Sequence, residues 1–304
     1  MSQERIRAEI CRVLMERQLS RGGWPALARS EQTALEPTIY SMLALGPSQK
    51  HGYERALRCL LDCQNPNGSW PSFIGDEREG AWTTALALIA LADNVEAARS
   101  QRKGFQWLLR SAGKESSWLW RWKFRTTDRQ VRFDSNKFGW PWQPDTNSWV
   151  VPTSFAILAL HHLPPSWAGE LAAFRLQKGT EMLLDRVCPG GGWNAGNGVV
   201  YGAALAPHLD DTAVALLALK NRSDEPAVKE SLAWLDGNIA RPSAPWSLAW
   251  SALALAAHSR CVHRLVSSLA QQLRPNDIRD TATLAVLALA LDVDRSLRLL
   301  TADP

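Results

Sequence analysis

The side chains with the clearest chemical potential lie in the segment 208–212, where His208, Asp210 and Asp211 form an H-x-D-D pattern. A carboxyl group that is removed from water beside a second carboxylate holds its proton more tightly than one in water. A histidine can hold such a group in place by a hydrogen bond. The pattern therefore predicts an acid that could protonate a weakly basic group. The alternative is structural, because aspartate is also a preferred residue at the start of a helix.

A second group of candidate side chains lies in residues 116–149, where tryptophan and arginine are concentrated. Indole faces stabilise cations, and guanidinium groups bind diphosphates and other anions through paired hydrogen bonds. We expect this segment to be an insert that covers the binding face of the ring. The alternative is that it only packs over the ring through its apolar side chains and binds no substrate. Arg129 and Arg132 add further positive charge. The expected substrate-binding residues are Trp118, Trp120, Trp122, Trp140, Trp142, Trp149, Arg121 and Arg125.

One sequence pattern occurs six times and predicts the elements that position these side chains. In each copy, a polar or proline-containing start is followed by an Ala/Leu-rich run. Each copy predicts a helix, and the runs are apolar on nearly every face, so the helices must be buried all round. Glu36 and Asp145, near the starts of two such helices, are lesser candidate acids. The six predicted inner helices are 37–45, 82–92, 152–163, 211–220, 246–257 and 280–291.

Between these runs lie six segments with a one-sided apolar stripe, which predict outer helices. Six helical hairpins whose inner helices cannot face water are satisfied by closing into a ring. We therefore predict an all-α, (α/α)6 toroid, one domain over residues 1–304, around an apolar central cavity. An open solenoid is the competing topology. The predicted outer helices are 4–18, 51–64, 95–110, 168–187, 225–240 and 260–273.

The turns after the outer helices carry glycine and tryptophan, as in 18–24, 63–70, 137–142 and 188–193, and two of them have the spacing Q-x3-G-x-W. This resembles the QW repeat of squalene-hopene and oxidosqualene cyclases and the related turns of prenyltransferase β subunits. Residues 190–219 are similar to the stretch of class II triterpene cyclases that runs from a GGW turn into the acid motif D-x-D-D-T-A. The chain departs from those large cyclases in having one toroid and in having His208 at the first acid position.

The resemblance implies a class II terpene-cyclase-like enzyme of the isomerase or lyase type, which protonates and cyclises an isoprenoid chain. It makes Asp210 the proton donor, Asp211 its neighbour and His208 a substituted partner. No metal or other cofactor is implied. A non-catalytic toroid that binds a hydrophobic ligand or acts as a scaffold is the main alternative, and the missing first aspartate favours it. A zinc prenyltransferase is a second alternative, weakened because the expected Asp, Cys and His ligands do not occur.

Composition excludes several other classes of function. The 34 basic and 30 acidic residues are interspersed, so the net charge of +4 does not predict a nucleic-acid partner. The sequence shows no apolar run of membrane-spanning length and no signal peptide, which predicts a cytoplasmic protein. Peripheral contact with the cytoplasmic face of a membrane stays open, and no pattern specifies an oligomeric state. Five scattered cysteines predict reduced thiols rather than disulfides.

Overall fold

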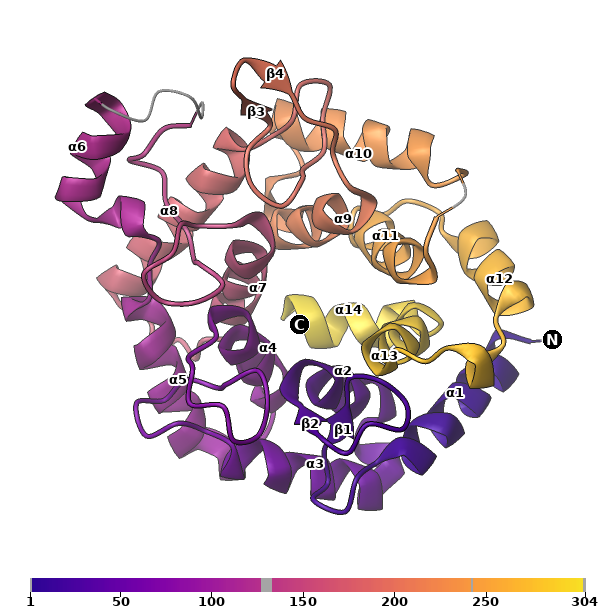
Figure 1. The fold of residues 1–304 in the computed structure, drawn as a ribbon. Helices are drawn as coiled ribbons and strands as arrows, with labels where there is room; N and C mark the ends of the chain where they lie inside the picture. The colour runs from indigo at the N-terminus through magenta and orange to yellow at the C-terminus, as the bar shows by residue number, and fades with distance from the viewer. Residues whose placement is uncertain (1, 127–132, 242, 303–304) are drawn as a thin grey trace.

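The computed structural model describes residues 2–126, 133–241 and 243–302, without the side chains of Arg125 and Thr126. Within these ranges the protein is mostly helical, and its main helices form two concentric rings (Figure 1). The inner ring consists of six helices that begin on one face of the toroid, which we call the mouth. These inner helices are α2 (Leu35–Leu45), α4 (Ala81–Leu91), α7 (Val150–His161), α9 (Leu209–Ala218), α11 (Pro245–Ala257) and α13 (Thr281–Ala290).

The outer ring alternates with the inner ring along the chain, as the one-sided apolar stripes predicted. The outer helices are α1 (Gln3–Arg17), α3 (Lys50–Asp62), α5 (Ala98–Arg110), α8 (Glu170–Asp185), α10 (Pro226–Asn238) and α12 (His263–Gln272). Short 3-10 turns lie at Pro47–Gln49, Val95–Ala97, Lys114–Ser116, Lys220–Arg222 and Pro275–Asp277. The predicted (α/α)6 toroid is confirmed.

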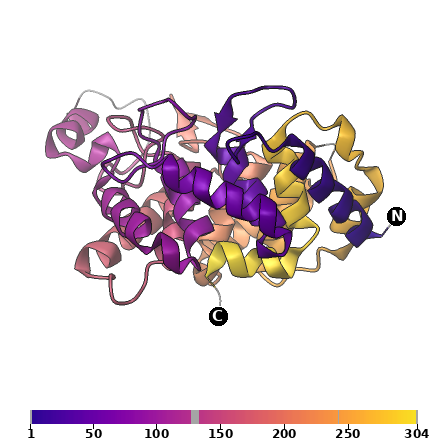
Figure 2. The same ribbon diagram turned by 90° about the horizontal axis from the view of Figure 1, so that it is seen from below.

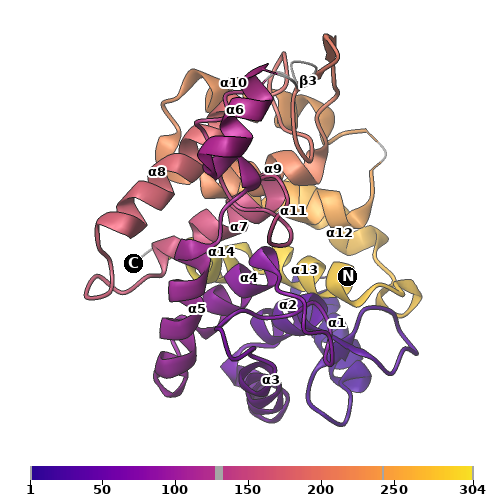
Figure 3. The ribbon, with the colours of Figure 1, turned by 60° about the vertical axis from the view of Figure 1, so that its left-hand side comes forward.

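The paired β-strands in the described residues form two short hairpins. Strand β1 (Trp24–Pro25) pairs with β2 (Thr33–Ala34), and β3 (Val199–Val200) pairs with β4 (Ala203–Ala204). The second hairpin leads directly into α9, so it lies beside the segment that carries the acid motif (Figure 3). None of the helices within the described ranges combines the length and the apolar character needed to cross a bilayer.

The repeated tryptophans of the turns join outer helices to inner helices. The Trp70 indole N–H donates to the carbonyl of Leu60 in the last turn of α3, at 2.8 Å, where helix carbonyls have no partner within the helix. The backbone N–H of Trp70 donates to the Thr84 hydroxyl of α4 at 2.9 Å. Trp24, Trp140 and Trp193 make the same two bonds in their own repeats. The turn tryptophans thus fasten each hairpin together.

The ring is closed by hydrogen bonds between its first and last repeats. The backbone N–H of Thr281, at the start of α13, donates to the carbonyl of Ala26 at 2.9 Å, and that of Ala28 donates to Arg279 at 2.8 Å. The backbone N–H of Leu35, at the start of α2, donates in the same way to the carbonyl of Ser72 in the turn of the next repeat. The first turn therefore completes the last inner helix, and the open solenoid is excluded.

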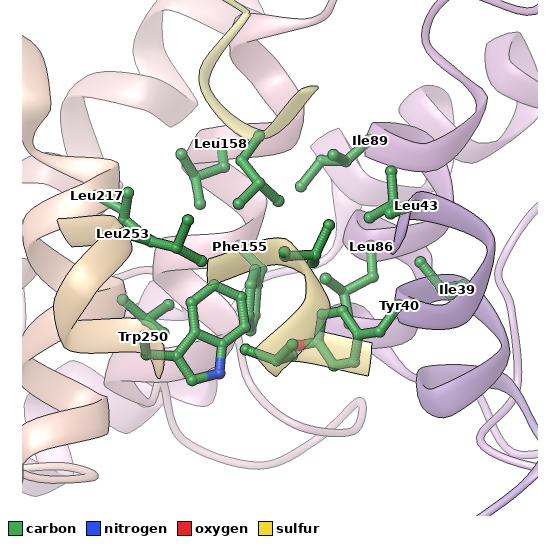
Figure 4. Close-up of a cluster of buried hydrophobic side chains, with 14 of the residues drawn as sticks. Ile39, Tyr40, Leu43, Leu86, Ile89, Phe155, Leu158, Leu217, Trp250 and Leu253 are labelled. Carbon is green, nitrogen blue, oxygen red and sulfur yellow. The ribbon is translucent and has the colours of Figure 1, made fainter. Parts of the chain in front are cut away.

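The axis of the ring is filled by side chains, which corrects the predicted central cavity. Inner helices on different sides of the ring send their side chains inward to meet one another (Figure 4). Tyr40, Leu86, Leu158, Trp250 and Leu253 have no accessible surface. A side chain that lined a water-sized void would retain some, so no such void touches these residues. Large aromatic and branched side chains occupy the space that the helix pattern alone left open.

The face of the ring opposite the mouth is covered by α14 (Val293–Thr301), a helix that the sequence analysis did not predict. It crosses beneath the inner helices, on the side of the toroid away from β1 and β2 (Figure 2). The Arg295 guanidinium donates to the carbonyls of Leu43 and Ala44, at 2.8 and 3.3 Å, at the end of α2. Since these carbonyls lack helical partners, α14 both covers the axial core and caps an inner helix.

Candidate acid site at the mouth of the toroid

His208 and Asp211 form a hydrogen-bonded pair at the start of α9. His208 is the N-cap residue of this helix, and its backbone N–H donates to the carbonyl of Trp193 at 2.8 Å. Its Nδ1 lies 2.8 Å from Oδ2 of Asp211. The imidazole is 59% exposed, whereas the Asp211 side chain is only 12% exposed. The pair thus joins a buried carboxyl group to a histidine that faces the mouth.

Burial raises the pKa of the Asp211 carboxyl above its usual range, and the negative charge of Asp210 adds to this effect. The hydrogen bond with His208 acts in the opposite direction, because it stabilises the carboxylate. Asp210 is half-buried on the adjacent position of the same first turn. The carboxyl that contacts His208 is therefore that of Asp211, one residue beyond the expected donor.

An apolar groove begins at His208 and has a volume of about 450 Å³. Trp149, Val200, Leu205 and Ala206 are among the apolar residues that line it. The ring of Trp149 lies against the backbone of Gly196, where an added Cβ would come within 3.2 Å of the indole. The groove therefore presents apolar surface next to His208, the exposed member of the pair.

The six expected tryptophans do not share one pocket. Trp118 and Trp122 are 69% and 64% exposed on α6 (Trp118–Thr126), a helix on the outer rim of the ring. Trp140 is fully buried as a fastener, with the Arg175 guanidinium 3.9 Å from its ring. Of the six, only Trp149 lines the groove.

The remaining expected binding residues are spread between α6 and the loop that follows it. Trp120 has Lys114 and Lys123 within 5.0 Å of its ring, and Trp142 packs edge-to-face on Trp82 of α4 at 5.1 Å. Arg121 is half-buried on α6. The side chain of Arg125 and the whole of Arg129 and Arg132 lie outside the described residues.

A second acidic group lies across the mouth, where Glu36 of α2 is close to Asp280 at the start of α13. Burial raises the pKa of the Glu36 carboxyl to about 7, with a further rise from the charge of Asp280 and an opposing effect of the Tyr40 hydroxyl. Asp280 accepts a hydrogen bond from the backbone N–H of Thr283 at 2.6 Å as the N-cap of α13. Glu36, noted in the sequence only as a lesser candidate, therefore has a strongly perturbed carboxyl.

Below Glu36 lies an aromatic cluster formed by Tyr40, Phe155, Trp246 and Trp250, which the sequence analysis missed. The Tyr40 ring meets Trp246 and Trp250 edge-to-face, with centroids 6.0 and 5.8 Å apart, and Phe155 lies 5.8 Å from Trp250. The sequence did contain a signal for this cluster. Glu36 and Tyr40 are four residues apart, as are Trp246 and Trp250, and this spacing places each pair on one helix face.

Side chains able to hold a metal ion are not grouped in this site. Across the described ranges, no cluster of three or more His, Cys, Asp or Glu side chains is arranged for a metal ion. The chemistry that the site itself offers is acid–base chemistry beside apolar and aromatic surface.

Comparison with known proteins identifies the fold. No family model matches the sequence, and no curated protein matches it. Among solved structures, the α-1,6-mannanase GH76A of Salegentibacter sp. superposes on this chain with a TM-score of 0.64 at 10% identity, and the match covers 97% of this chain and 100% of that one. That structure is of an inactive variant in which two adjacent aspartates are replaced by asparagine. The type II terpene cyclase MstE from Scytonema gives 0.62 at 15% identity, with 95% and 97% covered. The endoglucanase Cel10 from Klebsiella pneumoniae, a family 8 glycosyl hydrolase, gives 0.60 at 14%, with 95% and 99% covered. The chain thus has the toroid fold shared by terpene cyclases and glycoside hydrolases.

Proposed function

We propose that this protein is a class II terpene-cyclase-like enzyme that binds an isoprenoid chain at the mouth of the toroid and protonates it. The observation that carries the proposal is the apolar groove that ends at His208, whose imidazole is hydrogen-bonded to Asp211. A hydrocarbon chain would bury apolar surface against Trp149 and Leu205, and this burial is the main source of affinity for such a ligand. The chain's reactive end would then lie beside His208, which is hydrogen-bonded to the Asp211 carboxyl.

The proton donor that the geometry favours is Asp211. Its burial favours the neutral acid, and the adjacent negative charge of Asp210 favours it further. The resemblance to class II cyclases assigns the proton to Asp210 instead. His208, which is hydrogen-bonded to Asp211 and exposed to the mouth, can return a proton from solvent after each turnover.

The apolar lining of the groove favours an isoprenoid over a sugar, although two of the structural neighbours act on polysaccharides. A sugar presents hydroxyl groups on every side and needs hydrogen-bonding partners around it. Asn194, Asn197 and His208 are the polar side chains of its lining, and the other lining side chains are alkyl or indole groups. An adjacent pair of aspartates therefore does not by itself indicate a glycosidase here.

A second candidate function, a non-catalytic toroid that binds a hydrophobic ligand, is favoured by the filled axis of the ring. Cyclisation requires the whole chain to be folded in a cavity that excludes water, and the axial side chains Tyr40, Leu86 and Trp250 have no free space beside them. The two functions share the groove and differ in whether bound ligand is converted.

The test is to incubate the purified protein with farnesyl diphosphate, geranylgeranyl diphosphate and squalene and to analyse the products by mass spectrometry. Asp211→Asn keeps the size of the side chain and removes its transferable proton, so we expect it to reduce turnover at least 100-fold. Asp210→Asn should have a smaller effect. Asp224→Asn, at a fully exposed position, is the matched control. Ligand binding without any product in the wild-type protein would support the non-catalytic function.

A further inference from the structure

A cavity of about 560 Å³ lies on the face of the toroid opposite the mouth, where the inner helices α9 and α11 end. Three cationic side chains line it, and each comes from a different segment of the chain. Lys220 lies in the 3-10 turn that follows α9, Lys229 lies on α10, and Arg260 follows the end of α11. The described residues that line this cavity include no carboxyl group. Positive charge is therefore concentrated around open space.

The ion pairs that two of these cations make are weak. Lys229 lies 3.6 Å from the Asp224 carboxylate, and Arg260 lies 3.9 Å from that of Asp236. Both distances are long for an ion pair, and all four side chains are at least 42% exposed. Exposed ion pairs contribute little free energy because water and salt screen them. An anion in the cavity can therefore compete with these two carboxylates.

His258, the C-cap residue of α11, also lines the cavity, and its imidazole contacts the last turn of α9. Its Nε2 lies 2.9 Å from the carbonyl oxygen of Leu216, which can only accept, so Nε2 carries a hydrogen. Its Nδ1 lies 3.0 Å from the Ser223 hydroxyl oxygen, and that hydroxyl donates to the carbonyl of Lys220 at 2.7 Å. Because a hydroxyl has a single hydrogen, all three contacts are hydrogen bonds only when Nδ1 is protonated as well. The network thus fits the imidazolium form of His258.

The electrostatic surroundings of His258 nevertheless disfavour its charged form. Burial lowers the pKa of the imidazole, the hydrogen bond to Leu216 opposes this effect, and the positive charges of Lys220 and Arg260 lower the pKa further. The charged and titratable side chains around His258 and the cavity are His161, Lys220, Asp224, Lys229, Asp236 and Arg260. The hydrogen-bond network and the local charge thus oppose each other, and a negative charge in the cavity would remove the conflict.

We infer that this cavity binds the phosphate or diphosphate group of a soluble small molecule, and that His258 takes up a proton from solvent as the anion binds. A phosphate group carries about two negative charges and several acceptor oxygens, which suit cations that approach from three segments of the chain. Lysine and arginine bind such oxygens through charge-assisted hydrogen bonds. When an anion offsets the charges of Lys220 and Arg260, the imidazolium can complete its hydrogen bonds. The site lies on the face opposite the groove at His208, so the inference is independent of the proposed cyclase activity.

The first test measures binding of inorganic diphosphate at low salt by isothermal titration calorimetry. A hydrogen bond between charged groups contributes a factor of roughly 10 or more in affinity. Lys229→Gln and Arg260→Gln, which remove one charge each, should therefore each weaken binding by roughly 10-fold. The matched control is Lys50→Gln, at an exposed position on the outer helix α3, and it should bind as the wild type does. No binding of diphosphate, or binding that neither variant weakens, would overturn the site.

The second test follows the protonation of His258 by NMR, with sulfate as a dianion that does not titrate where phosphate does, near about pH 6. Without sulfate His258 should titrate below its ordinary pKa of 6.5, and sulfate should raise this pKa. Sulfate affinity should therefore increase severalfold as the pH falls from about 8 to about 5.5. His258→Gln, whose amide cannot be charged, should lose this dependence, whereas the exposed control His51→Gln should keep it. A His258 pKa that sulfate leaves unchanged would refute the proton uptake.

A lipid headgroup presents the same phosphate chemistry, and a third measurement separates it from a soluble ligand. The double variant Lys229→Gln/Arg260→Gln should lose binding of soluble diphosphate and should cosediment with phosphatidic acid vesicles as the wild type does. Diphosphate should also raise the Tm of the wild type and not that of the double variant, since a ligand that binds only the folded state stabilises it. Vesicle binding that the double variant loses, in a protein that binds no soluble diphosphate, would assign the cavity to a lipid headgroup and reject the small-molecule ligand.

Discussion

Replacing Glu36 by glutamine should stabilise the protein at neutral and alkaline pH. The substitution keeps the shape of the side chain and removes its charge. In the folded protein the carboxyl has a pKa of about 7, against an ordinary value of 4.5. Each pH unit of that difference corresponds to about 1.4 kcal/mol, so ionised Glu36 destabilises the fold by up to about 3 kcal/mol.

The pH range of this effect follows from the raised pKa. Below about pH 4.5 Glu36 is protonated in both the folded and the unfolded chain, so charge makes no difference. Between pH 4.5 and 7 the folded protein binds more protons than the unfolded chain, and the free energy of unfolding falls as the pH rises. Above pH 7 the full cost is present. Glu36→Gln should therefore match the wild type at pH 4.5 and exceed it at pH 8.

The assay is urea denaturation of both proteins from pH 4.5 to 8.5, followed by far-UV circular dichroism. A gain of about 3 kcal/mol at pH 8 corresponds to roughly 5 °C in Tm for a chain of 304 residues. Glu96→Gln, at an exposed position in the turn between α4 and α5, is the control and should show no such difference. A free-energy difference between Glu36→Gln and wild type that does not change with pH would refute the reasoning, since it would mean that Glu36 ionises as it does in water.

Three further predictions follow from other parts of the molecule. Trp70→Phe should lower the free energy of unfolding by about 1–3 kcal/mol, because it leaves the Leu60 carbonyl without its donor. Chemical denaturation measures this loss, with Trp118→Phe at an exposed position as the control. If the Trp70→Phe variant were as stable as the wild type, the indole hydrogen bond would not contribute to stability. We propose that α6 contacts anionic membranes through exposed Trp118 and Trp122 beside the basic residues Arg121 and Lys123. The double variant Trp118→Ser/Trp122→Ser should therefore cosediment severalfold less with phosphatidylserine vesicles. Undiminished binding by this variant would exclude α6 as the membrane contact. Any cyclisation by this protein should persist in EDTA, because proton transfer needs no metal, and loss of product that Mg²⁺ or Zn²⁺ restores would favour a metal-dependent reaction.

The sequence alone determined the ring and its fasteners. Six apolar runs alternating with amphipathic segments predict six hairpins, because an inner helix such as 82–92 has no polar face to turn to water. The turn residues were equally informative, since the glycine and tryptophan of 63–70 act within one repeat. The H-x-D-D segment was also predicted to start a helix, and His208 is the N-cap of α9 with Asp210 and Asp211 in its first turn. All these features depend on residues that are close in the chain.

Only the tertiary structure decided which side chains meet across the ring. The contact between Tyr40 and Trp250 joins positions 210 residues apart, and it depends on how each helix is rotated about its own axis. Sequence periodicity cannot specify that rotation for a helix that is apolar on all sides. For the same reason the filled axis could not be predicted. The resemblance to class II cyclases made Asp210 the proton donor, whereas the fold pairs Asp211 with His208. The pKa of Glu36 likewise depends on burial and on Asp280, which are set by closure of the ring rather than by neighbouring residues.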